Sequence, residues 1–392
     1  MINLQEKHTP SAFSLFNLGF RPFFLGGALS AALLIGLWLV IYSKGYQPNY
    51  YNLGVYWHAH EMLFGFSLAI IAGFLLTAVR TWTSVQTPHG WPLAGLFILW
   101  VVARILPIFS GIPDIVIAVT DLAFAPLVAV GIGWPIVRSG NFRNLIFIPL
   151  LVGFFIANLF IHLELLQITE GTANQGIQLA LFLVMVIISL IGGRVIPFFT
   201  ERGVEGVQCR KFALIEKGII PLSIIWIICS FTPFTMVTVV LSLILFILHG
   251  VRLAGWFKPA ILKVPLAWIL QLGYGFLVLG FGLYCLSLLE IVSQSIAFHA
   301  FAAGAIGSLT LGMMARVSLG HTARPLKAAP IMICAFVLMA LSALIRVTVG
   351  WLPLPDLAIL HLSGSLWVVG WLLFFVYYLP ILIKPRIDGV YG

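Results

Sequence analysis

Runs of about 20 predominantly apolar residues recur along the whole of this 392-residue chain. A bilayer core about 30 Å thick requires a run of that length for each helical crossing. The composition agrees, because 61% of the residues are hydrophobic, 8% are charged and the mean hydropathy is +1.11. Strands of a membrane barrel would instead alternate over about ten residues. The sequence therefore predicts an all-α, polytopic membrane helix bundle.

The apolar runs predict about twelve transmembrane helices within a single transmembrane domain over residues 1–392. The connections are too short to contain a soluble catalytic domain, so any chemistry must lie among the helices or at their ends. Residues 1–21 lack a small-residue cleavage site, and we interpret them as a short cytoplasmic leader. The predicted spans are 22–42, 58–79, 92–110, 115–137, 144–163, 177–198, 217–232, 234–250, 265–288, 296–317, 328–351 and 358–383.

Lys and Arg are distributed unequally between the two faces of this predicted topology. Those outside the spans fall on the side of the N-terminus, with Lys44 as the exception. The positive-inside rule therefore predicts that both termini are cytoplasmic. The net charge of +9 then reflects orientation and attraction to an anionic lipid bilayer, and it gives no indication of nucleic-acid binding.

Three four-helix sets bring similar residues to similar places. Arg80, Arg194 and Arg316 each lie at the cytoplasmic end of the second helix of a set. The second helices of the first and third sets also begin alike, as WHAHEMLFGF and FHAFAAGAIG, with His58 aligned on His299. An ancient threefold repeat is one hypothesis, and a general preference of Arg for cytoplasmic helix ends is the other. The sets cover residues 22–137, 144–250 and 265–383.

Histidines stand at the ends of several predicted spans. His58 and His60 open the second span and His299 opens the tenth, near the outer face, whereas His321 follows the tenth span at the inner face. Ionisable groups at membrane depth are costly and usually mark function. His299 and His321 cannot bind the same ion, because the chain between them rises about 33 Å as a helix.

The ligand types narrow the choice of metal. Imidazole suits Zn, Cu and Fe, and the four cysteines are too scattered for a thiolate site, so haem iron or copper fits best. His58 and His60 point about 200° apart on a regular helix, so they share a metal only if the helix begins after them. Glu61, one turn after His58, is expected to orient a ligating imidazole. For His162 and His361 we expect interfacial hydrogen bonding instead.

Charged residues inside the predicted spans form a second set of candidates. Asp121 is expected to pair with Arg104 or Arg346, the arginines otherwise extending toward the outer interface. Arg194 and Arg316 are expected either to bind haem propionates or to anchor the headgroup boundary. The glycines of GGR, which ends at Arg194, predict close packing before a helix break at Pro197.

Several segments of the sequence resemble the NnrS family of bacterial membrane proteins. The resemblance implies a twelve-helix protein of the bacterial inner membrane that binds haem, most simply b-type, and copper, and that protects against nitric oxide in denitrification-related metabolism. The segments, spread in order along the chain, are LFNLGFRPFF (15–24), WHAHEMLFGFSLAIIAGFLLTAV (57–79), GGRVIPFFT (192–200), PLAWILQLGYGFLVLG (265–280) and HAFAAGAIGSLTLGMMARVSLGHTARPL (299–326).

The resemblance also implies a set of site residues. The histidine motifs of the family fall on four histidines expected to bind metal, with Glu61 and two arginines beside them. Many relatives have histidine where this chain has Gln271, and Ala323 replaces a glycine of GHTGR, so this protein is expected to hold one metal fewer if Gln271 replaces a ligand. The implied residues are His58, His60, His299 and His321 for metal, Glu61 as their support, and Arg194 and Arg316 for the cofactor.

Three hypotheses of function follow. The preferred one is a metalloprotein in which haem iron, with copper nearby, binds nitric oxide or relieves its damage. No catalytic residue is identified, and turnover and the electron donor are left open. The second hypothesis is a twelve-helix secondary transporter for a metal, haem or a small anion, with the histidines lining its path. The third is a scaffold whose histidines are interfacial.

Overall fold

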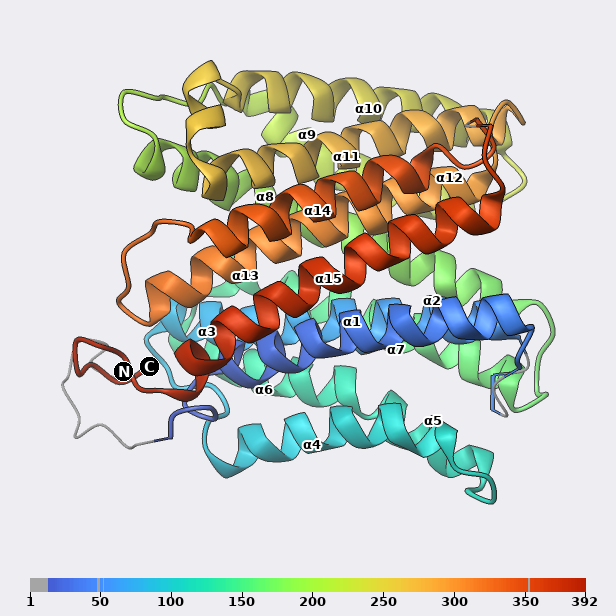
Figure 1. Ribbon diagram of the computed structural model, residues 1–392, viewed down its shortest axis with the longest axis horizontal. Coiled ribbons are helices and arrows are strands. Elements are labelled where there is room, and N and C mark those ends of the chain that lie inside the picture. The colour runs from blue at the N-terminus through green and yellow to red at the C-terminus, as the bar shows by residue number, and fades with distance from the viewer. Residues whose placement is uncertain (1–12, 48–49, 52, 352) are drawn as a thin grey trace. The chain divides into compact units, whose positions relative to one another are not determined.

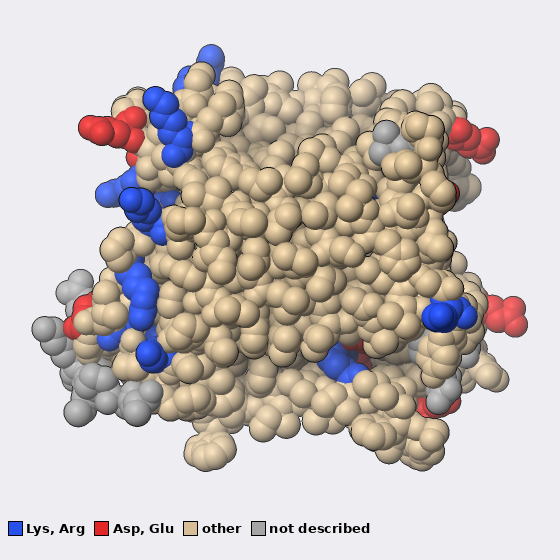
Figure 2. Space-filling view, viewed as in Figure 1, with Lys and Arg blue, Asp and Glu red and all other residues tan. Residues whose placement is uncertain are grey.

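The computed structural model describes residues 13–47, 50–51, 53–351 and 353–392, so the first twelve residues of the predicted leader lie outside it. All its regular elements in these ranges are helices, and twelve of the helices are long and apolar enough to cross a membrane. In Figure 2, uncharged side chains cover the middle of the helices and most charged ones lie near helix ends. The prediction of an all-α, multi-pass membrane protein is confirmed.

The helices group into two compact units, each described here by itself. Unit 1 contains residues 1–180, 317–325 and 374–392. Within it α1 packs against α3, α3 against α6, and α6 against α7, while α4 packs against α5 (Figure 1). Its elements are α1 (Phe20–Lys44), α2 (Gly54–His60), η1 (Glu61–Ser67), α3 (Leu68–Thr83), α4 (Trp91–Ile105), η2 (Leu106–Ile108), α5 (Asp114–Leu122), α6 (Phe124–Ser139), η3 (Phe142–Asn144) and α7 (Phe147–Leu165).

Unit 2 contains residues 181–316 and 326–373. Here α11 packs against α10, α12 and η5, while α9 packs against α10 and α14 against η5. The hypothesis of three four-helix repeats stays a prediction. The remaining elements, of which α8, α13 and α15 extend into both units, are α8 (Thr172–Gly203), α9 (Ala213–Ser230), α10 (Thr235–Trp256), η4 (Pro259–Lys263), α11 (Pro265–Leu288), α12 (Gln294–His299), η5 (Ala300–Ile306), α13 (Gly307–His321), α14 (Pro330–Val347) and α15 (Asp356–Ile383).

A π-helical segment interrupts both the second and the tenth span, as η1 and η5. Such segments are rare, and they often mark functional sites because the wider turn leaves backbone groups free for other partners. In η1 the indole N–H of Trp100 donates to the carbonyl of Gly65 at 2.9 Å, and the hydroxyl of Ser67 donates to the carbonyl of Met62 at 2.7 Å. The first bond holds η1 against α4, and the second lies within η1.

Two helix boundaries differ from the predicted ones. The second span begins at Gly54, so His58 and His60 lie inside a helix and face in different directions. The predicted break at Pro197 is wrong, because α8 continues through this residue to Gly203. Proline removes only one backbone donor, and inside a membrane a continued helix keeps the neighbouring backbone groups hydrogen-bonded.

Gly193 of the GGR segment makes room for the buried guanidinium of Arg252 in unit 2. Arg252, 3% exposed, donates to both carboxylate oxygens of Glu216 at 2.8 and 2.5 Å and to the hydroxyl of Tyr274 at 2.9 Å. A Cβ at Gly193 would overlap the Arg252 guanidinium, whereas a Cβ at Gly192 would meet only ordinary contacts at 3.4 Å or more. The GGR segment is therefore closely packed as expected, and at Gly193 it packs against the side chain of Arg252.

Gly193→Ala is expected to destabilise the protein by about 1–3 kcal/mol, because the added methyl displaces the Arg252 guanidinium from its partners. Thermal unfolding of the detergent-purified protein measures the effect. Gly192→Ala is the matched control and should unfold at the wild-type temperature. Equal unfolding temperatures for the two variants would contradict this explanation.

Candidate metal centre

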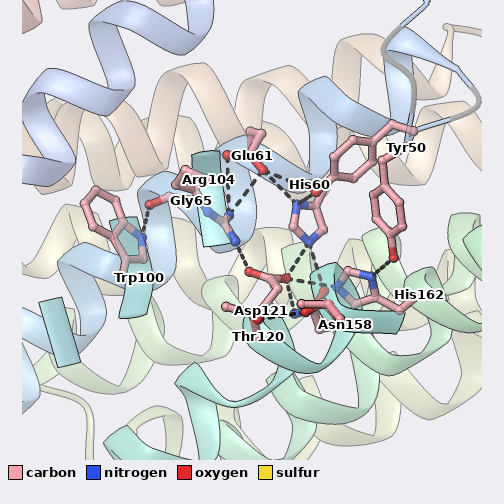
Figure 3. A network of polar contacts seen from close by, with 12 residues as sticks. Tyr50, His60, Glu61, Gly65, Trp100, Arg104, Thr120, Asp121, Asn158 and His162 are labelled. Carbon is pink, nitrogen blue, oxygen red and sulfur yellow. Dashed lines mark hydrogen bonds and ion pairs between the residues drawn. The ribbon is translucent and has the colours of Figure 1, made fainter. Parts of the chain in front are cut away.

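Asp121 of α5 is the centre of a buried polar network in unit 1 (Figure 3). Its Oδ2 atom lies 3.0 Å from Nε2 of His60, 3.0 Å from Nε2 of His162 and 2.7 Å from Nδ2 of Asn158. Its Oδ1 atom pairs with the guanidinium of Arg104 from α4. One carboxylate thus joins side chains from four separate helical elements.

His60, the last residue of α2, is fully buried and surrounded by oxygen atoms. Its Nδ1 atom lies 2.9 Å from the hydroxyl of Tyr51 and 3.1 Å from Oε1 of Glu61. Its Nε2 atom lies 3.0 Å from Oδ2 of Asp121 and 2.9 Å from Oδ1 of Asn158. Oxygen atoms thus face both ring nitrogens, a setting that favours a positive charge on or beside the ring.

His162 completes the group from α7. It lies four residues after Asn158, so both side chains lie on the same face of that helix. Its Nδ1 atom lies 2.7 Å from the hydroxyl of Tyr50, and its Nε2 atom points at Asp121. Burial raises the pKa of Tyr50 and that of Tyr51, in the loop between α1 and α2, so both phenols keep their protons at neutral pH.

Glu61 and Arg104 form the other side of the network. Nη1 of Arg104 lies 3.3 Å from Oε1 of Glu61. Gly65, one turn later in η1, leaves the space that these two side chains need, because a Cβ there would lie 2.8 Å from Oε2 of Glu61 and 3.2 Å from Arg104. The π-helical segment and its glycine therefore seat the ion pair at the edge of the histidine cluster.

The charges of the network do not balance without an added cation. Asp121 and Glu61 contribute two negative charges, and Arg104 contributes one positive charge. With neutral imidazoles the group carries a net charge of about −1 in a setting of low dielectric, where uncompensated charge is costly. A proton on an imidazole or a bound metal ion would supply the missing positive charge.

The donor set fits a bare metal ion and does not fit haem. His60, His162 and Asp121 each offer one ligand atom, and these atoms lie within 4.8 Å of one another. Two imidazoles and one carboxylate are a common ligand set for Fe, Cu and Zn. A haem held by both histidines would need space for its porphyrin between them, and here Asp121 Oδ2 occupies that position, 3.0 Å from each Nε2.

A comparison with known protein families identifies the family of this chain. Residues 14–386, nearly the whole chain, match the family described as NnrS protein. The chain belongs to the NnrS family. No curated protein matches it significantly. The resemblance predicted from the sequence segments is thereby confirmed for the NnrS family.

The structure distributes the predicted NnrS site residues over both units. In unit 1, the ring of His58 stacks on Trp38 with centroids 4.6 Å apart, and that of His321 lies 5.5 Å from the ring of Phe20. His299 belongs to unit 2, as do Arg194 and Arg316. Among the described residues, His60 is therefore the one predicted ligand that belongs to the triad.

The support expected from Glu61 is directed at His60 and not at His58, which faces elsewhere. The predicted pairing of Asp121 with an intramembrane arginine is confirmed, and Arg104 is that partner. His162 was expected to be interfacial, yet it is 1% exposed and bonded on both ring nitrogens. The signal that could have identified it is the Asn158–His162 pair, spaced by one helical turn within an apolar helix.

We expect His60→Ala and His162→Ala each to reduce the bound metal by about tenfold or more, because each removes one of the three converging ligand atoms. Elemental analysis for copper, iron and zinc on the purified protein measures this. His58→Ala, which alters a nearby imidazole outside the triad, should leave the metal of the triad in place. Loss of the same metal in His58→Ala alone would contradict the assignment.

Tyr50→Phe tests the support of the triad. Removal of the hydroxyl that bonds Nδ1 of His162 should weaken metal affinity by about 10–100-fold without changing the number of sites. Competition with a metal-binding dye gives the affinity. An unchanged affinity would show that His162 needs no support from Tyr50 to bind the ion.

Proposed function

We propose that this protein is a metal-binding protein of the bacterial inner membrane that protects cells against nitric oxide. The observation that supports it most directly is the convergence of His60, His162 and Asp121 in a buried part of unit 1. Family membership supports the link to nitric oxide, as a proposal carried over from the NnrS family. Three buried ligand atoms that converge on one position favour a metal-binding protein over a scaffold with interfacial histidines.

Copper is our proposed occupant of the triad. Imidazole nitrogen is a good copper ligand, and a bound cation balances the net negative charge of the network. The haem that the family resemblance implies needs another site, for which His58, His299 and His321 are the predicted ligands. When bound, copper or haem iron supplies an open coordination position at which a small gas can bind.

The protein side chains around the triad orient the ligands and keep water away. Tyr50 and Tyr51 hold the Nδ1 atoms of the two histidines, so that both Nε2 atoms converge. Arg104 occupies Oδ1 of Asp121 and leaves Oδ2 for the shared position. Because both histidines and the carboxylate are at most 5% exposed, the site excludes bulk water.

The orientation of the chain in the membrane is part of the proposal. The excess of Lys and Arg on one side of the predicted topology supports cytoplasmic positions for both termini. His60 and Asp121 lie in the first halves of the second and fourth spans, and His162 lies in the last turn of the fifth. With cytoplasmic termini, the triad would therefore be nearer the periplasmic side. Fusion of a reporter that is active only in the periplasm to Lys44 or to residue 392 tests this orientation.

A complementation experiment tests the function. A strain that lacks this gene should grow poorly with a nitric oxide donor, and the wild-type gene should restore growth. His162→Ala should fail to restore it, because the triad loses a ligand. Thr120→Val is the matched control, since Thr120 neighbours Asp121 in α5 but is only partly buried and donates its hydroxyl to the Val116 carbonyl of the same helix. Full protection by His162→Ala at equal protein levels would contradict the proposal.

Transport is a second candidate function, and the π-helical segments favour it. Interrupted helices at corresponding places in two parts of a chain are a feature of secondary transporters. Here η1 and η5 interrupt the second and the tenth span, which the sequence comparison had already aligned. Copper uptake into proteoliposomes containing the protein would favour transport, whereas stable binding without uptake would favour the proposed protective role.

A further inference from the structure

Arg316 of α13 is a buried guanidinium without a counter-charge among the described residues of its unit. Its side chain is 3% exposed. Within the described part of unit 2, no carboxylate lies within ion-pairing distance of it and no hydrogen-bond partner is present for its Nε atom. Its neighbours are the ring of Phe199, 4.2 Å from Cζ, and the backbone of Gly203. A charged group in this situation is strongly destabilising unless something binds it.

The other buried arginines of this chain have hydrogen-bond acceptors in the protein. Arg21 donates to the carbonyls of Leu382, Lys384 and Gly392. Arg252 has Glu216 and Tyr274, and Arg80 donates to Gln86. Each of these guanidiniums is held by oxygen atoms of the chain. Arg316 differs from them because it has no such oxygen partner among the described residues of unit 2.

The surroundings of Arg316 supply only part of the missing negative charge. The last turn of α8, from Phe199 to Gly203, lies against the guanidinium, and the C-terminus of a helix carries about half an elementary negative charge. The face of an aromatic ring adds a further attraction. Neither places an acceptor oxygen at the planar edge of the guanidinium. That edge forms bidentate hydrogen bonds with carboxylate and phosphate groups.

We propose that Arg316 binds an oxyanion, a phosphate or carboxylate group, at the end of α8. The segment around the end of α8 has a small excess of positive charge beside Arg316, because Arg202, Arg210 and Lys211 outnumber Glu201 and Glu205. The oxyanion is supplied by a lipid headgroup, by a free anion or by the propionate of a cofactor. The site lies outside the histidine triad and is independent of its metal.

The Arg316→Met substitution is expected to stabilise the protein, whereas most substitutions of buried residues destabilise it. In anion-depleted, detergent-purified protein, Arg316→Met should unfold at a higher temperature than wild type, because it removes an unpaired buried charge. Added inorganic phosphate should raise the unfolding temperature of wild type and leave that of Arg316→Met unchanged. Arg316→Lys keeps the positive charge but cannot form bidentate hydrogen bonds, so the phosphate affinity of this variant should be about tenfold lower than that of wild type.

Arg202→Met is the matched control, because Arg202 also lies over a phenylalanine ring, that of Phe198, but is exposed. It should respond to phosphate as wild type does. If depleted Arg316→Met is less stable than wild type and phosphate affects both alike, the helix end and the Phe199 ring suffice for Arg316, and the proposal is wrong.

Native mass spectrometry of the protein extracted from membranes identifies the source. A phospholipid adduct that is lost in Arg316→Met indicates a headgroup, and a haem adduct lost in the same variant indicates a propionate. A phosphate-sized adduct that returns on titration with inorganic phosphate indicates a free anion. Identical adducts and identical phosphate responses in wild type, Arg316→Met and Arg202→Met would overturn the proposal.

Discussion

The carboxylate of Asp121 is the interaction on which the candidate site depends. In a medium of low dielectric an isolated carboxylate is very costly, so each of its oxygen atoms needs a strong donor. Arg104 meets one of them, and the imidazoles of His60 and His162 converge on the other. The same electrostatic demand therefore brings α2, α4, α5 and α7 together and creates a position for a cation.

The local backbone is adapted to that demand. The π-helical segment η1 begins at Glu61, directly after His60, and its wider turn is held by Trp100 at Gly65. Because Gly65 has no Cβ, Glu61 and Arg104 fit beside it. A regular helix with a larger residue at position 65 would crowd the ion pair, so the irregular backbone and the buried charges are parts of one arrangement.

The two units treat buried cations in different ways. In unit 1, Arg104 is neutralised by the carboxylates of Asp121 and Glu61, and the remaining negative charge favours a cation. In unit 2, Arg252 is neutralised by Glu216, whereas Arg316 has no such partner among the described residues of that unit. One unit thus favours a bound cation and the other favours a bound anion, by the same principle that buried charge requires compensation.

The sequence by itself determined the class of the fold, because runs of apolar residues of bilayer length allow only helices with satisfied backbones. It also identified the family and the need of Asp121 for an arginine, because an intramembrane charge is too costly to lack a partner. Only the tertiary structure decided that His162 joins His60, that His58 lies outside this triad, and that Arg316 has no ion-pair partner among the described residues of unit 2. These facts depend on which helices pack together and on how each helix is rotated about its axis. The sequence of an apolar helix with a weak amphipathic pattern does not determine either property.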